Sequence, residues 1–276
     1  MDLNPIIEHY QQNFSSKYAS RITRQQKKAL GAILSCRTER FGKMQLECQS
    51  CDYKGTAFHS CGHRSCHNCQ HHETSRWLDR QNQKILPVDY FMVTFTLPFE
   101  LRSLAWHNQK EIYQALFSCA ISTLKTFGIN DKKLGADTGG TAVLHTHSRQ
   151  LNYHPHLHII VPGGCLDRNR KQWKKLKGGY LFNAIALAKV FRARFLETLN
   201  KPNLSVPPRM PTKWVVHCKN VGRGLPALKY LSRYLYRGVI SENNIINDTG
   251  TEVTFRYKDS KTDAFKTRTV RGKNFL

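Results

Sequence analysis

Six of the nine cysteines lie in a short stretch near the N-terminus, and this feature constrains the fold more than any other. Cys48-x2-Cys51 and Cys66-x2-Cys69 form two knuckles separated by fourteen residues. Four thiolates at such spacing can close a tetrahedral zinc site. A site with all four positions filled has no opening for water, so we expect a structural ion that folds a segment too short for its own core.

A second zinc could be bound in the same stretch, where five further potential ligands lie: Cys36, His59, Cys61, His63 and His67. We take Cys36, His59 and Cys61 as its ligands, although surface histidines need no metal to explain them. The spacing does not determine which cysteine pairs with which. The sequence therefore predicts one or two zinc ions.

The charge balance indicates the partner. Forty-three Lys and Arg against 19 Asp and Glu give a net charge of +24, which favours nucleic acid over a small metabolite. No stretch approaches the roughly 18 consecutive apolar residues of a membrane-spanning helix. The first ten residues do not resemble a secretory signal peptide. We therefore expect a cytoplasmic protein without a membrane partner.

The pattern of the chain changes near residue 86, after a helix-compatible run from 71 to 86 that Pro87 closes. Before this point we expect a helical and zinc-binding domain, residues 1–86, which begins with an amphipathic helix over 14–34. Beyond it, residues 87–276 alternate strands with helices and predict an α+β domain with a central antiparallel sheet and flanking helices. The expected strands cover 90–97, 141–147, 156–161 and 213–218, the expected helices 101–127, 183–199 and 225–236, and a terminal hairpin joins 239–246 to 252–258.

A histidine-rich strand pair suggests a second kind of metal site. His156 and His158 alternate along a strand and therefore point to one face. A short connection would let the preceding strand lie antiparallel and bring a third ligand toward them. We prefer His145 for this ligand, with His147 and Gln150 as alternatives. Neutral imidazole suits transition metals, but Mg²⁺ or Mn²⁺ could also bind if oxygen ligands complete the shell.

Two tyrosines stand one turn apart on an expected helix. Tyr230 and Tyr234 share a face because residues four apart are neighbours on a helix. A phenol is a poor nucleophile at its free pKa, but a phosphate polarised by a metal lowers the demand on it. Aromatic residues at helical spacing are more often part of a core. A catalytic role for these tyrosines is therefore supported mainly by the predicted histidine site.

Basic residues near these motifs are candidates for DNA contact. The run from 168 to 177 carries Trp173 among its lysines and suits a surface that tracks a DNA backbone and stacks bases, although a solvated insertion loop explains it equally well. The residues expected to contact DNA are Arg64, Lys171, Lys174, Lys175, Arg233 and Arg237.

Taken in order, these motifs resemble the two-tyrosine HUH transposases of rolling-circle insertion sequences, which carry a zinc-binding domain at the N-terminus. The likeness covers nearly the whole chain. It includes the cysteine pattern, the strand Val93-Thr94-Phe95-Thr96-Leu97-Pro98, His145-Thr146, His156-Leu157-His158 with the following Val161-Pro162-Gly163-Gly164, and Tyr230-Leu231-Ser232-Arg233-Tyr234. Such proteins usually continue past the terminal hairpin, so this chain resembles a shortened member.

The resemblance implies that His156 and His158 bind a catalytic divalent ion and that Tyr230 and Tyr234 attack single-stranded DNA at transposon ends. Cleavage would give a 5′-phosphotyrosine and a free 3′-OH, and the second tyrosine would then accept a second strand. No nucleotide cofactor is needed, because the covalent link stores the bond energy.

Three other functions are compatible with parts of the pattern. A rolling-circle replication initiator shares the chemistry, but the N-terminal cysteines argue against it. A zinc-ribbon DNA-binding regulator would use the histidines and tyrosines only structurally. A metallohydrolase of small substrates would leave the charge of +24 without a purpose. The sequence does not determine the oligomeric state.

Overall fold

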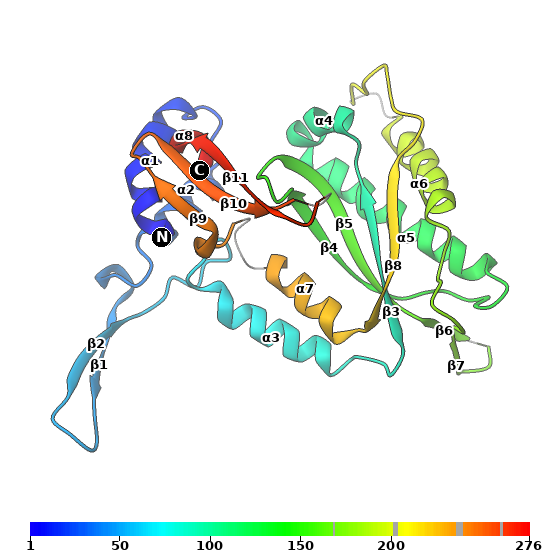
Figure 1. Cartoon of the computed structure of the whole chain (residues 1–276), viewed down its shortest axis with the longest axis horizontal. Helices are drawn as coiled ribbons and strands as arrows, with labels where there is room; N and C mark the ends of the chain where they lie inside the picture. Colours follow the sequence, from blue (N-terminus) through cyan, green and yellow to red (C-terminus); the bar gives the residue numbers. More distant parts are fainter. Residues whose placement is uncertain (168, 201–203, 236–239, 260–261) are drawn as a thin grey trace. The chain divides into compact units, whose positions relative to one another are not determined.

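The computed structural model describes residues 1–167, 169–200, 204–235, 240–259 and 262–276, with the backbone alone at 70–72, 227, 230 and 233–235. The chain forms two compact units (Figure 1). One unit contains Met1–Trp77, Arg149–Leu151 and Arg233–Leu276, and the other contains Leu78–Ser148 and Asn152–Ser232. This division differs from the contiguous one expected at residue 86, because the C-terminal segment groups with the N-terminal helices.

The first unit begins with two helices, α1 (Leu3–Lys17) and α2 (Arg24–Leu34), where the sequence predicted one helix over 14–34. The break has a local cause. Thr23 is extended and caps α2, and its hydroxyl accepts from the Gln26 backbone while the Gln26 side chain accepts from the Thr23 backbone. This capping box starts a new helix at a point where periodicity alone suggests continuation.

The C-terminal sheet packs on α1. It contains β9 (Ile245–Asp248), β10 (Glu252–Lys258) and β11 (Phe265–Arg271) in the order β11-β10-β9, followed by the short α8 (Gly272–Phe275). Ile6 and Tyr10 of α1 form one core with Ile245 and Val253. A Cβ at Gly272 would lie 2.1 Å from the Tyr10 ring, so only glycine allows this packing. The β9–β10 pairing confirms the predicted hairpin, whereas β11 was not predicted.

The remaining part of the first unit carries the cysteine-rich segment. After the short 3-10 helix η1 (Glu39–Phe41), β1 (Lys43–Glu47) and β2 (Lys54–Phe58) form a largely exposed hairpin. The helix α3 (Gln70–Asn82) follows the last cysteine of the cluster and continues into the second unit. A further 3-10 turn, η3 (Glu242–Asn244), precedes β9.

A four-stranded antiparallel sheet in the order β4-β5-β3-β8 dominates the second unit and confirms the predicted fold class. Its strands are β3 (Asp89–Thr96), β4 (Thr141–His147), β5 (Tyr153–Pro162) and β8 (Val215–Arg223). A two-stranded hairpin, β6 (Gly164–Asp167) with β7 (Gln172–Lys175), extends from the end of β5.

Helices cover one face of this sheet. The 3-10 turn η2 (Phe99–Leu101), α4 (Arg102–His107), α5 (Gln109–Asn130) and α6 (Ala184–Leu199) supply the helical half of the core. Figure 1 shows α5 and α6 together on this side. The predicted helix over 101–127 is divided at Asn108, whose side chain donates to the Leu104 carbonyl at 3.0 Å.

Side chains alternate along each strand, so those that do not face the helices point to the other face of the sheet. Phe91, Val93 and Phe95 of β3 are almost fully buried in the core beneath the helices. The intervening residues of β3 therefore point away from it, together with their register partners on the neighbouring strands. The helix α7 (Leu225–Leu235) follows β8. Within the described residues, the structure contains no helix suited to crossing a membrane.

Candidate metal centres and active site

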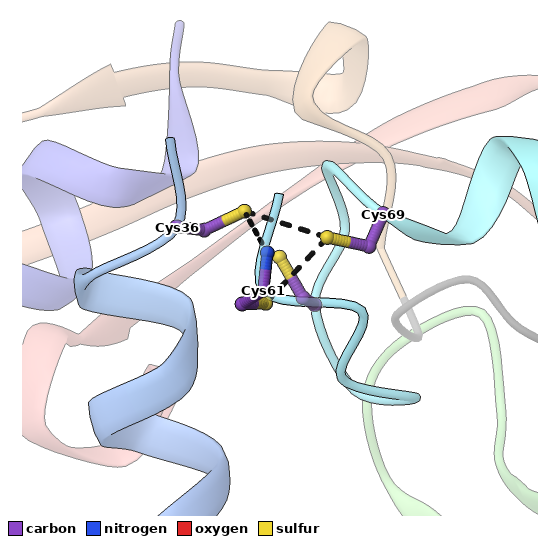
Figure 2. A group of neighbouring side chains, drawn as sticks. Cys36, Cys61 and Cys69 are labelled. Atoms are coloured by element: carbon purple, nitrogen blue, oxygen red, sulfur yellow. Dashed lines mark hydrogen bonds between the residues drawn. The ribbon is translucent and has the colours of Figure 1, made fainter. Parts of the chain in front are cut away.

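Four cysteine sulfurs form the first candidate metal centre. The Sγ atoms of Cys36, Cys61, Cys66 and Cys69 all lie within 4.8 Å of one another. The Cys36–Cys69 and Cys61–Cys69 separations are 3.4 and 3.5 Å (Figure 2). Zinc–sulfur bonds of about 2.3 Å in a tetrahedron imply sulfur separations of about 3.8 Å. The donor set and its spacing therefore fit a structural zinc ion.

The chain brings these sulfurs together from three places. Cys36 comes shortly after α2, Cys61 and Cys66 come from the loop after β2, and Cys69 directly precedes α3. The backbone N–H of Cys61 donates to the Cys36 sulfur at 3.5 Å, and that of His63 donates to the Cys61 sulfur at 3.4 Å. Such donors stabilise thiolates, which are the form that binds metal.

Burial and hydrogen bonding act on the thiols in opposite directions. Burial raises the pKa of Cys66 and raises that of Cys61 to about 11. Burial also acts to raise the pKa of Cys69, but hydrogen bonds from Cys36 and Cys61 outweigh it and lower this pKa to about 7. A zinc ion would therefore displace protons from at least two of these thiols when it binds at neutral pH.

The prediction that the two C-x2-C knuckles share one zinc ion is wrong for the first knuckle. Cys66 and Cys69 belong to the tetrad, but Cys48 and Cys51 are exposed and lie outside it. The hairpin explains the separation, because β1 and β2 pair over five residues each and hold this knuckle at the turn. Five residues of strand span about 17 Å. The exposed thiol of Cys48 accepts a hydrogen bond from Ser50, which lowers its pKa to about 7.

The ligands proposed for a second zinc are divided by the structure. Cys36 and Cys61 belong to the tetrad, whereas His59 lies at the base of the β1–β2 hairpin, where its backbone N–H donates to Gly42. Within the described residues, the cysteines therefore form one four-thiol group rather than two sites. Spacing alone favoured the two C-x2-C pairs, and no signal in the sequence indicated the length of the intervening hairpin.

Three histidines on the face of the sheet opposite to α5 and α6 form the second candidate centre. One ring nitrogen from each of His145, His156 and His158 lies within 4.8 Å of the others. His145 of β4 is the direct register partner of His156 on β5, and His158 follows two residues later on the same face. The ring centroids are 4.4 Å apart for His145–His158, 4.9 Å for His156–His158 and 5.1 Å for His145–His156.

Neighbouring groups orient two of these rings. Nδ1 of His156 donates to the His154 carbonyl at 2.6 Å, which leaves the Nε2 lone pair for a metal. Nδ1 of His158 lies 3.0 Å from the Thr94 hydroxyl of β3. Such contacts fix ring orientation at metal sites. Thr94 was not among the expected site residues, because a threonine in a strand is unremarkable without the register.

The three imidazoles are neutral at neutral pH. Burial, together with the nearby His158 and His156, lowers the pKa of His145 to about 2, and burial together with His156 lowers the pKa of His158 to about 3. Burial also lowers the pKa of His156. A pKa well below the ordinary value of about 6.5 keeps a ring nitrogen available as a ligand. The arrangement thus fits a divalent ion with open positions for oxygen ligands.

The alternatives to His145 lie outside this cluster. A bulge between His145 and His147 shifts the register, and His147 instead pairs with Tyr153. The ring nitrogen of His147 is 2.9 Å from the Thr146 hydroxyl. Gln150 donates to the Tyr257 hydroxyl at 3.2 Å, within the first unit. The structure therefore brings His145 to the pair, as the sequence preferred.

The expected nucleophiles lie on α7. Tyr230 and Tyr234 are four residues apart in this helix, but their side chains are outside the described residues. Leu228 of the same helix lines a cavity with Ile160, which follows His158 by two residues on β5. The first turns of α7 are therefore on the histidine-bearing face of the sheet.

The residues expected to contact DNA differ in their exposure to solvent. Lys171 and Lys175 are exposed on the β6–β7 hairpin, and Arg64 is exposed in the cysteine-rich loop. Lys174 instead forms an ion pair with Asp167 at 3.1 Å, so its charge is partly neutralised. Arg237 and the side chain of Arg233 lie outside the described residues.

Comparisons with known proteins identify relatives for both parts of the chain. Residues 139–276 match a family described as putative transposase, and residues 6–97 match a transposase zinc-binding domain. A putative transposase of Sinorhizobium fredii, y4qJ, is 32% identical over 98% of this chain and 74% of its own length. The transposase for insertion sequence element IS801 of Pseudomonas savastanoi pv. phaseolicola is 28% identical over 86% of this chain and 62% of its own.

A solved structure of the conjugative relaxase TrwC, in complex with OriT DNA and bound metal, gives a partial match. It covers 46% of this chain and 49% of that one, with 19% identity and a TM-score of 0.37. A likeness of this size supports no statement about function.

Proposed function

The chain belongs to the two-tyrosine HUH transposases of rolling-circle insertion sequences, and on that premise we propose that it cleaves and rejoins single-stranded DNA at transposon ends. The observation that carries the proposal is the cluster of His145, His156 and His158 on the paired strands β4 and β5. Their neutral rings suit Mg²⁺ or Mn²⁺ when oxygen ligands complete the shell. A bound ion would polarise the scissile phosphate.

The chain's own groups would carry the covalent chemistry. The phenol oxygen of Tyr230 or Tyr234 attacks phosphorus, the bond to the 3′ oxygen breaks, and this oxygen takes a proton to become a free 3′-OH. The product is a 5′-phosphotyrosine, and the second phenol can form the same link with another strand. Their spacing of four residues on α7 supports this division of labour.

The cysteine tetrad has a different role in this proposal. Four thiolates leave no open position on zinc, so the ion would hold the loop between α2 and α3 rather than take part in cleavage. Arg64 lies exposed in this loop, and we expect it to contact a DNA phosphate. The tetrad thus supports binding, and the histidine cluster supports chemistry.

A cleavage assay on labelled single-stranded DNA with Mn²⁺ tests the proposal. His156→Ala should abolish cleavage and leave DNA affinity within about twofold at fixed salt, because phosphate contacts supply most of the affinity. His9→Ala, an exposed histidine outside the cluster, is the matched control and should cleave normally. Equal loss of binding and cleavage in His156→Ala would assign the histidines a structural role, and a wild type that binds without cleaving would indicate a regulator.

A further inference from the structure

Three side chains outside both candidate centres converge within the first unit. Asp2, His67 and Glu242 each offer one ligand atom, and these atoms all lie within 4.8 Å of one another. Asp2 directly precedes α1, His67 lies in the cysteine-rich loop, and Glu242 begins η3. All three belong to the first unit, although they come from three separate segments of the chain. Neither the cysteine tetrad nor the proposed DNA chemistry uses them.

The His67 ring is the first unusual feature of this group. Both of its ring nitrogens are buried, and neither has a hydrogen-bond partner among the residues that the structure describes. Buried polar atoms are rarely left in this state, because nothing then replaces the contact with water that they lose on folding. The ring therefore calls for a partner that the described residues do not supply.

The distance between His67 and Glu242 is the second unusual feature. Nε2 of His67 lies 3.1 Å from Oε1 of Glu242, and the two atoms approach without a hydrogen bond. Nitrogen and oxygen ligands lie about 2.0–2.2 Å from an ion such as Zn²⁺, so two ligands are about 3.0 Å apart at a right angle and about 3.4 Å apart in a tetrahedron. The observed separation lies between these values, so one ion can contact both atoms.

The start of α1 positions the two carboxylates. Oδ1 of Asp2 accepts from the backbone N–H of Asn4 at 3.0 Å, and Oε1 of Glu242 accepts from the backbone N–H of Leu3 at 3.1 Å. The partial positive charge of a helix N-terminus explains why carboxylates gather there, but it does not explain the unpartnered imidazole of His67. The side chain of His67 is 11% exposed and that of Glu242 is 38% exposed, so the group is open to solvent on its carboxylate side.

We propose that Asp2, His67 and Glu242 bind one divalent transition-metal ion, separate from the zinc of the tetrad and from the ion of the histidine cluster. Two carboxylates balance the charge of such an ion, and the imidazole binds it through a ring nitrogen. Water completes the shell on the exposed side. Because carboxylate and water are ligands that suit Mn²⁺, this ion is a valid probe of the site.

The ion connects three segments of the first unit. His67 lies between Cys66 and Cys69 of the tetrad, Asp2 caps α1, and Glu242 lies shortly before β9. A ligand that binds only the folded form stabilises that form in proportion to its concentration. The inference thus makes the stability of the first unit depend on a second metal ion, and it does not depend on DNA cleavage.

The test counts the Mn²⁺ ions that bind to the full chain when its tetrad holds zinc. The His156→Ala substitution disrupts the histidine cluster, so an ion that still binds belongs to the proposed site. Free Mn²⁺ gives a sharp electron paramagnetic resonance signal that is lost on binding to protein. Titration of the His156→Ala chain should show one bound Mn²⁺.

Two conservative variants assign this ion to its ligands. Glu242→Gln keeps an oxygen that can accept from the Leu3 backbone, and Asp2→Asn keeps the cap of α1, since asparagine caps as well as aspartate. Each variant, made in the His156→Ala chain, should weaken Mn²⁺ binding by more than about tenfold, because a lost ligand costs more than a lost supporting group. Glu39→Gln, an exposed carboxylate of the same unit outside the group, is the matched control and should bind Mn²⁺ normally.

Hydrogen exchange gives a second readout. The Leu3 amide donates to Glu242, so its exchange requires this contact to open. Mn²⁺ at about a hundred times its Kd should slow this exchange by about 100-fold in the His156→Ala chain, and Glu242→Gln should remove the effect. Retained zinc and an unchanged circular dichroism spectrum would show that each variant is folded.

Absence of bound Mn²⁺ in the His156→Ala chain would overturn the inference and leave His67 and Glu242 as an ion pair. Equal Mn²⁺ affinities in Glu242→Gln and Glu39→Gln would overturn it too, and so would Leu3 exchange that does not respond to Mn²⁺. A chain that binds this ion but forms no adduct with DNA would contradict the proposed function alone.

Discussion

Single residues around the histidine cluster orient the rings that bind the ion. The Thr94 hydroxyl is 3.0 Å from Nδ1 of His158 and holds the opposite nitrogen toward the other two histidines. Loss of such a partner typically costs 10- to 100-fold in metal affinity. We therefore expect Thr94→Val to weaken Mn²⁺ binding by about tenfold or more, measured by calorimetry.

Thr96→Val provides the control for this prediction. Thr96 lies two residues further along β3, faces the same side and is the register partner of His156. Its substitution removes the same hydroxyl group from the same strand. Equal Mn²⁺ affinities in the two variants would mean that Thr94 does not position His158.

The sequence indicated the histidines but not their supporting groups. His156 and His158 follow from strand alternation, and His145 from a short connection between antiparallel strands. Thr94 lies 64 residues from His158, so only the register of β3 with β5 reveals it.

At the scale of secondary-structure elements, the β1–β2 hairpin decides which cysteines can share an ion. Cys36→Ser removes a buried ligand of the tetrad and should reduce the zinc content well below one ion per chain. Cys48→Ser changes an exposed thiol at the hairpin turn and should leave the zinc content unchanged. Elemental analysis of both purified variants makes the measurement. Loss of zinc in Cys48→Ser with retention in Cys36→Ser would restore the pairing of the two C-x2-C knuckles.

The elements themselves were predictable where the pattern is strong. The strands β3, β4 and β5 and the helices α6 and α7 lie close to the positions that periodicity predicted. Periodicity failed at Thr23 and Asn108, where a side chain hydrogen-bonds to a nearby group and interrupts a run that otherwise remains helix-compatible. The sequence pattern does not predict the strand β11, because most of its residues are exposed and polar and it has no alternating apolar face.

For the molecule as a whole, the first unit depends on both ends of the chain. Ile6 is 1% exposed and packs in one core with Ile245 and Val253, which are more than 200 residues away in sequence. Contacts of this range leave no local signal, so the sequence suggested contiguous domains instead. The two family matches, to residues 6–97 and 139–276, are also continuous segments and do not reveal this core shared between the two ends of the chain.

This shared core makes a prediction about stability. Ile6→Ala removes a fully buried side chain and should destabilise the first unit by about 2–5 kcal/mol. Hydrogen exchange should then lose protection in β10, although the substitution is in α1. Leu46→Ala, on the exposed β1–β2 hairpin, should have almost no effect. Unchanged exchange in β10 of Ile6→Ala would show that the C-terminal sheet is stable without α1.

The covalent adduct between the chain and DNA tests the central claim most directly. Wild-type protein incubated with labelled single-stranded DNA and Mn²⁺ should give a band that survives denaturation. Phenylalanine keeps the ring and removes the hydroxyl, so Tyr230→Phe with Tyr234→Phe should abolish this band without disturbing packing. Each single variant should retain some adduct. The variant that retains more adduct has lost the tyrosine that attacks less often. A third tyrosine, Tyr236, follows two residues after Tyr234 in the sequence and is not expected to attack DNA. An adduct that persists in the double variant and disappears in Tyr236→Phe would contradict the assignment of the nucleophiles.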